Sequence, residues 1–307
     1  MELYGVGNMI SYYREKNGLT QRQLCRGICT EATICRIETG CREFDSLISE
    51  TLLERLGKTA DRLEFVLNDE DYVLNELRCN ILTEIREHRT EQAEKLLEKY
   101  EDSMPERDRL HQQFVLFARG LLLEEAEEGE AAVKNFEEAL ALTDADQEKK
   151  GSGMILYSSV EIELIYHLFC HGRIGIERVF LAFDFMEKLY DAEMKRQYMI
   201  PFLWRLLEQY KRDGDFAGIV RICEKAIGIL NAGRSYEYLA AFYWEKLKAQ
   251  EQQMSARGID DNEKRELQIQ GKTLYYMSMI EEDTKRICEI AEFCRERLGC
   301  QIIGQEI

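Results

Sequence analysis

The 307-residue sequence predicts an all-α protein with two domains. Two prolines and 20 glycines amount to about 7% of the chain, where ~12% is usual, and this leaves little material for the many turns of a β protein. Hydrophobic residues at 45% and charged residues at 32% are typical of a globular chain that buries a core. The length suits two ordinary domains better than one. We expect a first helical domain at residues 1–67 and a second at 68–307.

Charge is distributed unevenly between these two parts. The chain carries 41 basic and 58 acidic residues, a net charge of −17, which excludes a polycation that coats nucleic acid. Residues 1–67 hold nine basic and ten acidic groups, so nearly all of the negative excess lies in residues 68–307. Residues 14–42 hold six basic groups and three acidic ones, a local balance of +3. Any contact with DNA must come from such a locally basic surface.

Cysteine usage and the N-terminal sequence indicate the compartment. Ten cysteines without a Cys-x-x-Cys pair are far below the density of a disulfide scaffold, so we expect reduced thiols. The segment Met1–Gly5 lacks a basic and an apolar signal region, and no later stretch approaches 18 uninterrupted apolar residues. We therefore expect a cytoplasmic protein that does not enter a membrane.

Residues 1–67 are expected to form short helices separated by tight turns. Thr20 and Gln23 form a capping box, in which each side chain satisfies a backbone N–H at the start of the second helix. Thr30 offers a similar cap to the third helix. The helices are expected over residues 7–17, from residue 21, over 31–38 and over 46–56, with Leu24, Ile28, Ile34 and Ile37 turned inward.

Residues 70–307 show long amphipathic segments in pairs. Breaks between them recur at intervals of roughly 39 to 45 residues, a period typical of a helical-hairpin solenoid. Small residues such as Ala93, Ala132 and Ala139 fall where a second helix must pack closely on its partner. The breaks are expected at residues 88–90, 127–129, 171–173, 212–214 and 257–258.

The segment Leu19–Gly40 resembles the helix-turn-helix of the Cro/phage-repressor (XRE) class. The matching features are Leu19-Thr20-Gln21 at the start of the second helix, the compact turn Gly27-Ile28-Cys29-Thr30, and Ile37-Glu38 followed by Gly40. The segment is more closely similar to the form in the peptide-responsive PlcR/PrgX/NprR/Rgg (RNPP) family. The resemblance continues as architecture, because a tetratricopeptide-like array follows that domain. It also implies that Arg14 and Glu38 pair and tie the first helix to the third.

The geometry of a groove-bound helix selects the candidate DNA-binding residues. Such a helix reads base edges with its first exposed residues, while the helix before it points backbone N–H groups at a phosphate. Gln21 would then hold the DNA backbone, and Glu31 could accept from a cytosine amino group. A four-helix bundle with a solvated basic face is the alternative. The expected DNA-binding residues are Gln21, Arg22, Thr30, Glu31, Thr33, Arg36 and Arg42.

Residues that could bind metal or perform catalysis have simpler interpretations. Cys25, Cys29, Cys35 and Cys41 lack the two-residue gap of zinc knuckles, so most are expected to be small buried hydrophobic residues. His167 and His171 lie one helical turn apart without the acidic base of a His-Glu-x-x-His peptidase. We expect no metal and no cofactor. No constellation of residues favours an enzyme.

Aromatic residues gather in the first helices of the later hairpins, and the first helices line the concave face of a tetratricopeptide array, where extended peptides bind. An aromatic stripe is usually core, but residues 236–244 carry too many rings for one buried face. Arg205 could take a peptide carboxylate. The expected peptide-binding residues are Tyr166, Tyr198, Phe202, Trp204, Arg205, Tyr236, Tyr243 and Trp244.

The resemblance implies a quorum-sensing transcription regulator. An imported signalling peptide would change the curvature of the array and so set the spacing of two DNA-binding domains. Because one recognition helix reads only a few base pairs, we expect a homodimer on an inverted-repeat operator, with its interface in the array. The alternative is a helical scaffold that acts mainly through a protein partner, with DNA binding secondary.

Overall fold

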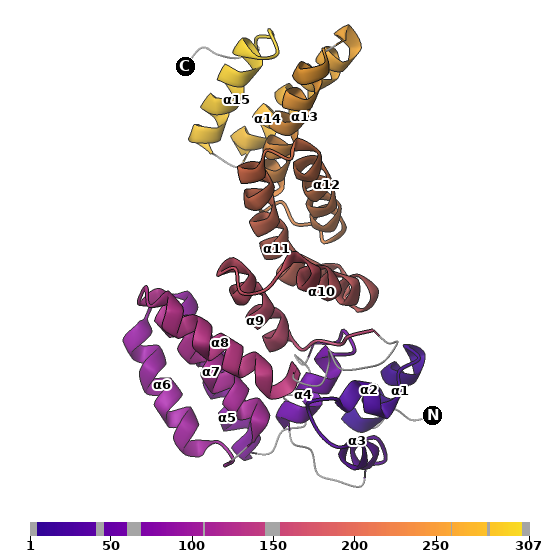
Figure 1. Ribbon diagram of the computed structural model, residues 1–307, viewed down its shortest axis with the longest axis vertical. Helices are drawn as coiled ribbons and strands as arrows, with labels where there is room; N and C mark the ends of the chain where they lie inside the picture. The colour runs from indigo at the N-terminus through magenta and orange to yellow at the C-terminus, as the bar shows by residue number, and fades with distance from the viewer. Residues whose placement is uncertain are drawn as a thin grey trace. The chain divides into compact units, whose positions relative to one another are not determined.

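The computed structural model describes residues 5–40, 46–59, 69–106, 108–144, 154–258, 260–280 and 283–302. These residues form helices and turns without a strand, which confirms the all-α prediction (Figure 1). The helices are α1 (Val6–Lys16), α2 (Gln21–Cys25), α3 (Glu31–Glu38), α4 (Ser46–Glu54), α5 (Asp69–Arg86), α6 (Thr90–Ser103), α7 (Arg109–Glu125), α8 (Gly129–Asp144), α9 (Ser159–Cys170), α10 (Ile176–Leu189), α11 (Ala192–Asp213), α12 (Phe216–Ala232), α13 (Leu239–Arg257), α14 (Asp261–Ile280) and α15 (Thr284–Glu296).

The chain divides into two compact units, Met1–Asp191 and Ala192–Ile307. The first unit contains both the α1–α4 cluster and the first hairpins. The predicted domain boundary between residues 67 and 68 lies outside the described residues, so it stays a prediction. Within the described ranges, no helix is both long and apolar enough to cross a membrane.

The helices α1 to α4 enclose a small apolar core at the start of the first unit. Ile10, Leu24 and Ile34 are fully buried there, and Ile37 is 2% exposed, as their spacing predicts. Ile28 is only half-buried, because it follows the last turn of α2 instead of extending that helix. The predicted bounds of the third helix match α3, whereas the fourth helix ends two residues earlier than expected.

Helical hairpins follow in the same unit. The helix α5 packs on α6, α7 on α8, and α9 more loosely on α10, and Figure 1 shows α5 to α8 side by side. The first two turns between partners contain His88 and Glu127 in the left-handed conformation, with φ of 57° and 61°. Ala93, Ala132 and Ala139 are fully buried where the helices meet. The predicted breaks near residues 88, 128 and 172 are therefore confirmed.

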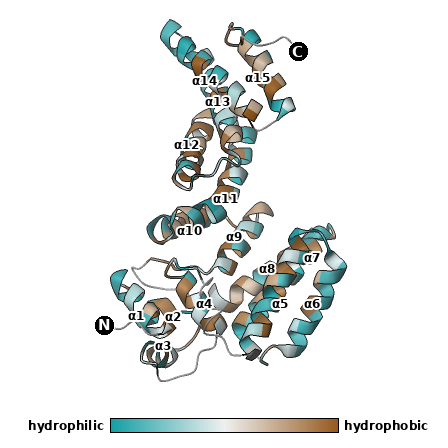
Figure 2. Cartoon of the chain, turned by 180° about the vertical axis from the view of Figure 1, so that it is seen from behind, coloured by the Kyte–Doolittle hydropathy of each residue, from teal (hydrophilic) through white to brown (hydrophobic). Residues whose placement is uncertain are grey.

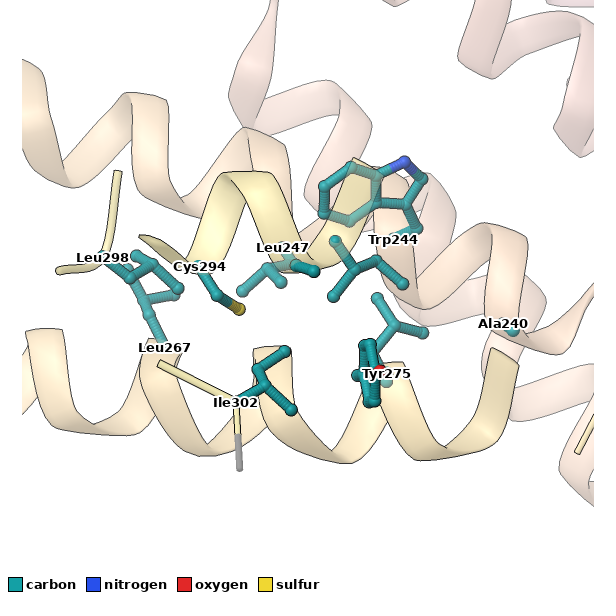
Figure 3. Packing of buried hydrophobic residues seen from close by; sticks show 11 residues of the cluster. Ala240, Trp244, Leu247, Leu267, Tyr275, Cys294, Leu298 and Ile302 are labelled. Carbon is teal, nitrogen blue, oxygen red and sulfur yellow. The ribbon is translucent and has the colours of Figure 1, made fainter. Parts of the chain in front are cut away.

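The second unit continues this pattern. The helix α12 lies against both α11 and α13, and α14 lies against both α13 and α15. Figure 2 shows that α12 is largely hydrophobic, in contrast to the hydrophilic α6 of the first unit. The last helices enclose a cluster that includes Trp244, Leu267, Leu274, Cys294 and Leu298 (Figure 3). The predicted breaks at residues 212–214 and 257–258 coincide with the ends of α11 and α13, as expected.

Candidate functional site

The helices α2 and α3 each begin with a side-chain cap. Thr20 Oγ1 accepts from the backbone N–H of Gln23 at 3.2 Å, and Gln23 Oε1 accepts from the N–H of Thr20 at 2.8 Å. This confirms the predicted capping box. Thr30 Oγ1 accepts from the N–H of Thr33 at 3.1 Å and so starts α3. Local hydrogen bonds thus fix where both helices begin.

A cluster of charged and polar side chains ties α1, α2 and α3 together. Arg14 donates to Glu38 through Nε at 2.6 Å and through Nη2 at 2.9 Å, which confirms the pair implied by the family resemblance. These hydrogen bonds raise the pKa of Arg14, although partial burial acts in the opposite direction. Gln21 Nε2 also donates to Glu38, at 2.8 Å. Gln21 is half-buried, and this hydrogen bond holds α2 to α3, while its contact with the DNA backbone stays a prediction.

Polar residues at the start of α3 are exposed beside α2. Thr30, Glu31 and Arg36 are exposed, and Thr33 is half-buried with its hydroxyl 2.9 Å from that of Thr30. Arg22 Nε lies 3.8 Å from Glu31 Oε1, and these side chains are 79% and 60% exposed. A pair this exposed contributes little to stability, so both groups can exchange partners. Arg42 lies outside the described residues, and so does Cys41.

Trp204 and Tyr238 are exposed rings of the second unit that lie close together, and Tyr236 is exposed two residues before Tyr238. The Trp204 side chain is 37% exposed and lies with its ring centroid 5.3 Å from that of Phe242 and 6.4 Å from that of Tyr238. Tyr236 is 77% exposed and Tyr238 is 54% exposed. We call Trp204, Tyr236 and Tyr238 the aromatic patch. Tyr238 belongs to the predicted ring-rich stretch, but helical spacing could not single it out, because it precedes the first turn of α13.

Backbone conformation explains how the loop before α13 presents these rings. Arg234 and Tyr238 adopt the left-handed conformation, with φ of 51° and 62°. Non-glycine residues rarely adopt this conformation, and each costs about 1–2 kcal/mol. Such strain persists only where the surrounding structure imposes it, and it is concentrated at functional sites. The loop that exposes Tyr236 and Tyr238 thus contains two strained residues, Arg234 and Tyr238.

Two predicted ligand contacts are core residues. Phe202 is 1% exposed and Trp244 is 7% exposed. Trp244 packs edge-on against Phe293 with ring centroids 5.2 Å apart, inside the cluster of α13, α14 and α15 (Figure 3). Because neither ring reaches the surface, Phe202 and Trp244 can support a ligand site but cannot line one in this conformation.

Four further predicted contacts are half-buried. Tyr198 and Arg205 are half-buried on α11. Tyr243 is half-buried and lines a groove of about 410 Å³ between α13 and α14, opposite Ile269 and Thr273. Tyr166 lies on α9 in the first unit. Because Phe202 and Trp244 are buried, the eight predicted residues do not form one exposed surface.

His167 of α9 and His171, the residue after the end of α9, share one carboxylate. Glu124 lies 2.7 Å from Nδ1 of His167 and 2.6 Å from Nε2 of His171. Burial would raise the pKa of Glu124, but the hydrogen bonds and charges of the two histidines lower it below its usual value. Among the described residues, no group of three or more ligands could hold a metal ion. The cluster is a junction between α7 and α9.

The cysteines differ in environment more than their spacing suggested. Cys25 is buried, Cys29 is partly buried, and Cys35 is exposed on α3. Cys35 is thus an exception to the burial expected for most of these cysteines, because the buried face of α3 is occupied by Ile34 and Ile37.

Fold and sites together define an all-helical chain in which a capped two-helix motif precedes stacked hairpins. No family model matches the chain, and no curated protein matches it significantly. Similar solved structures include PlcR from Bacillus thuringiensis in complex with the peptide PapR7 and DNA, with 15% identity, 93% of this chain and 98% of that chain covered, and a TM-score of 0.46. Apo ComR from S. thermophilus is 15% identical, and the match covers 94% of this chain and 98% of that chain with a TM-score of 0.44. Apo ComR from Streptococcus vestibularis is 17% identical, and the match covers 94% of this chain and 96% of that chain with a TM-score of 0.42.

Proposed function

We propose that the chain is a cytoplasmic transcription regulator, a DNA-binding protein and not an enzyme, that inserts α3 into the major groove. The observation that carries the proposal is the exposed face of the capped α2–α3 pair. Arg22, Thr30 and Arg36 lie on that face, and donors of these types suit phosphates and base edges. The locally basic balance of residues 14–42 in an otherwise acidic chain supports the same role.

Selection from a random duplex library tests this proposal. The full chain should enrich one sequence, and Arg36→Ala should weaken binding to it by about 10- to 100-fold, as expected for loss of a base or phosphate contact. Arg221→Ala is the matched control, because Arg221 is exposed on α12 and the variant removes the same charge elsewhere. Equal affinity of the Arg36→Ala and Arg221→Ala variants would contradict docking through α3.

The proposal includes a short peptide bound at the aromatic patch of the second unit. Rigid rings lose little conformational entropy on binding, so a few of them can hold a short peptide. Arg205 on α11 can take a carboxylate of that peptide. With DNA and a peptide, the proposal assigns to this chain the two kinds of partner present in the PlcR complex.

Tryptophan emission tests the peptide site, because the chain has two tryptophans and Trp204 is the exposed one. A Trp244→Phe variant leaves Trp204 as the reporter, and its emission should shift when peptides from a culture of the producing cell are added. The Trp204→Phe variant should show no comparable shift. An unchanged emission in both variants, with unchanged DNA affinity, would contradict peptide sensing.

A second copy of the chain is the remaining partner in this proposal. The helix α14 exposes Ile269, Thr273, Tyr276 and Ile280 at intervals of four, three and four residues, the spacing of a coiled-coil seam. Antiparallel pairing of two copies would place Ile269 opposite Ile280 and Thr273 opposite Tyr276, so the seam is complementary to itself. Light scattering should show a dimer that Ile280→Glu weakens, whereas Thr284→Glu, which places the same charge on an exposed residue at the start of α15, should not.

The scaffold alternative is favoured by one observation. A groove of about 410 Å³ between α6, α7 and α8 has an apolar floor at Leu97 and Leu122 and acidic walls at Glu94, Glu98 and Glu128. Such a groove suits a basic amphipathic segment of a protein partner. If the chain enriches no duplex but binds a Lys- and Leu-rich peptide that Glu98→Gln releases, the scaffold function replaces DNA reading.

A further inference from the structure

A buried arginine connects the turn between α2 and α3 to the helical hairpins. Arg55, which follows α4, is 1% exposed. Its Nη1 donates to the carbonyl oxygen of Leu24 at 3.3 Å and to that of Arg26. Its Nη2 donates to both carboxylate oxygens of Glu161, at 2.8 and 3.1 Å. One guanidinium thus bridges the end of α2 and the first turn of α9.

The carboxylate of Glu161 is itself held on the side of the hairpins. Glu161 Oε2 accepts from the backbone N–H of Ser158 at 2.7 Å, and Oε1 accepts from the hydroxyl of Thr143 at 2.7 Å. Gln113 Nε2 donates to that hydroxyl, also at 2.7 Å. Hydrogen bonds therefore run without interruption from the α2–α3 turn through Arg55 to α9, α8 and α7.

A close backbone contact lies at the same place. Gly27, in the α2–α3 turn, has φ of 75°, and a Cβ built on it would lie 2.0 Å from the carbonyl oxygen of Thr143. Next to Arg55, Glu54 accepts from the N–H of Ser159 at 3.0 Å and from its hydroxyl at 2.5 Å. The turn that precedes α3 is thus in direct contact with the hairpins.

Stability alone does not account for a charged pair in this position. Removing two charges from water is costly, and apolar residues of similar volume often replace a buried ion pair without loss of stability. A planar guanidinium that donates to backbone carbonyls through Nη1 and to a carboxylate through Nη2 instead fixes the orientation of one relative to the other, which a lysine cannot do. What Arg55 fixes here is the pair of carbonyl groups that ends α2, immediately before the cap of α3.

We propose that Arg55 and Glu161 are positioning residues for DNA reading, which hold the α2–α3 turn in its reading geometry from the hairpin side without touching DNA. This inference rests on the proposed function and deepens it. It assigns control of operator affinity to Glu161, a residue of α9 that is 1% exposed and lies more than 100 positions from α3 in the sequence.

Three variants of the full chain separate positioning from stability. Arg55→Lys keeps the charge opposite Glu161 but loses the planar fork. The double variant Arg55→Met with Glu161→Leu replaces the pair by apolar groups and leaves no unpaired charge. Arg78→Lys is the matched control, because Arg78 is 6% exposed and pairs at 2.8 Å with Glu50 of α4 instead of with the α2–α3 turn.

The measurements are affinity for a duplex selected by the wild-type chain, the unfolding midpoint, and hydrogen exchange at the amides of Ile28 and Cys29. These amides donate to the carbonyl of Cys25 at 2.9 and 3.0 Å. The Arg55 variants should lose at least tenfold in affinity and at least tenfold in protection of these amides, at temperatures where they are folded. Arg78→Lys should change neither quantity by more than twofold.

The outcomes keep the inference distinct from the proposed function. If the wild-type chain selects no duplex, DNA reading fails, and exchange at Ile28 and Cys29 still decides whether Arg55 holds the turn. If the folded Arg55 variants keep wild-type affinity and wild-type protection, the inference is overturned. Loss of affinity equal to that of Arg78→Lys would likewise assign the pair a merely structural role and overturn it.

Discussion

The α2–α3 segment and the aromatic segment of α11 to α13 differ in what determines the direction of a side chain. In α2–α3, Thr20 and Thr30 cap their helices through bonds that span three residues, so local spacing decides which residues are exposed. In α11, Phe202 and Trp204 are two residues apart, yet one is buried by neighbouring helices and the other is exposed. Exposure can be predicted where local bonds set it and not where distant helices do.

The rule that local bonds determine the structure of α2–α3 should fail most strongly at Gly27. This residue lies in that segment but contacts the backbone of the distant residue Thr143. Gly27→Ala should lower the free energy of unfolding by about 3 kcal/mol or more, because the left-handed conformation and the clash with Thr143 both oppose a Cβ. Gly18→Ala is the control, since its φ is 66° but nothing lies within 4 Å of the added Cβ. Urea denaturation should show about 1 kcal/mol for Gly18→Ala. Equal losses of unfolding free energy in the two variants would show that the contact between Gly27 and Thr143 does not affect stability.

Substitutions on the α2–α3 face test whether local spacing correctly predicts which of its residues are exposed. Arg36→Ala should leave the free energy of unfolding within about 0.5 kcal/mol, because Arg36 is exposed. Gln21→Ala should lower it by about 1 kcal/mol, since Glu38 loses a donor. Both variants should weaken binding to the selected duplex. Thermal unfolding and fluorescence anisotropy with labelled duplex measure the two effects, and a destabilised Arg36→Ala variant would contradict the assigned exposure.

The contact between α4 and α9 should make stability depend on pH. Burial and the charge of Glu50 raise the pKa of Glu54 to about 7, against about 4.3 in an unfolded chain. The folded state therefore binds this proton more tightly, and the contribution of Glu54 to the free energy of unfolding falls as pH rises from about 4.5 to about 7.

Urea denaturation across this range should show the decline in the wild-type chain and a flatter profile in Glu54→Gln. The amide of that variant keeps the size of the side chain without its charge. A profile that is identical in the two proteins would mean that the pKa of Glu54 does not change on folding.

The smallest expected effect concerns the two tryptophans. Acrylamide should quench the emission of a Trp244→Phe variant, which retains the 37% exposed Trp204, more than that of Trp204→Phe, which retains the 7% exposed Trp244. Trp204→Phe should change the free energy of unfolding by no more than about 0.5 kcal/mol, as for other surface positions. Equal quenching of the two variants would remove the distinction between patch and core.

Much of the fold could be predicted because its signals are local. The capping box at Thr20, the cap at Thr30 and the breaks between hairpins depend on neighbouring residues and on the helical period. The bridge between Arg55 and Glu161 could not, because it joins residues 106 positions apart and neither residue type predicts burial. Its single local sign is the capping box of Ser158 and Glu161 at the start of α9.

The candidate sites also differ in how well the sequence predicts them, because only some of their residues are positioned by local interactions. The exposed face of α3 follows from Ile34 and Ile37, whose spacing defines the buried side. The aromatic patch does not follow from spacing, since Tyr238 is presented by a loop with two left-handed residues instead of by a helical face. The burial of Trp244 depends on Phe293, which belongs to α15 and lies 49 positions away in the sequence.

Two glycine contacts with the hairpins limit how freely residues 5–59 can be exchanged between proteins. A Cβ at Gly27 would lie 2.0 Å from the carbonyl oxygen of Thr143, and one at Gly57 would lie 2.2 Å from that of Leu189. Both glycines therefore fit against main-chain atoms of α8 and α10, and not against side chains that could rearrange. A chimera that joins residues 5–59 to a foreign array would need carbonyl groups at the same two places. Transplantable units of this protein must include the first three hairpins.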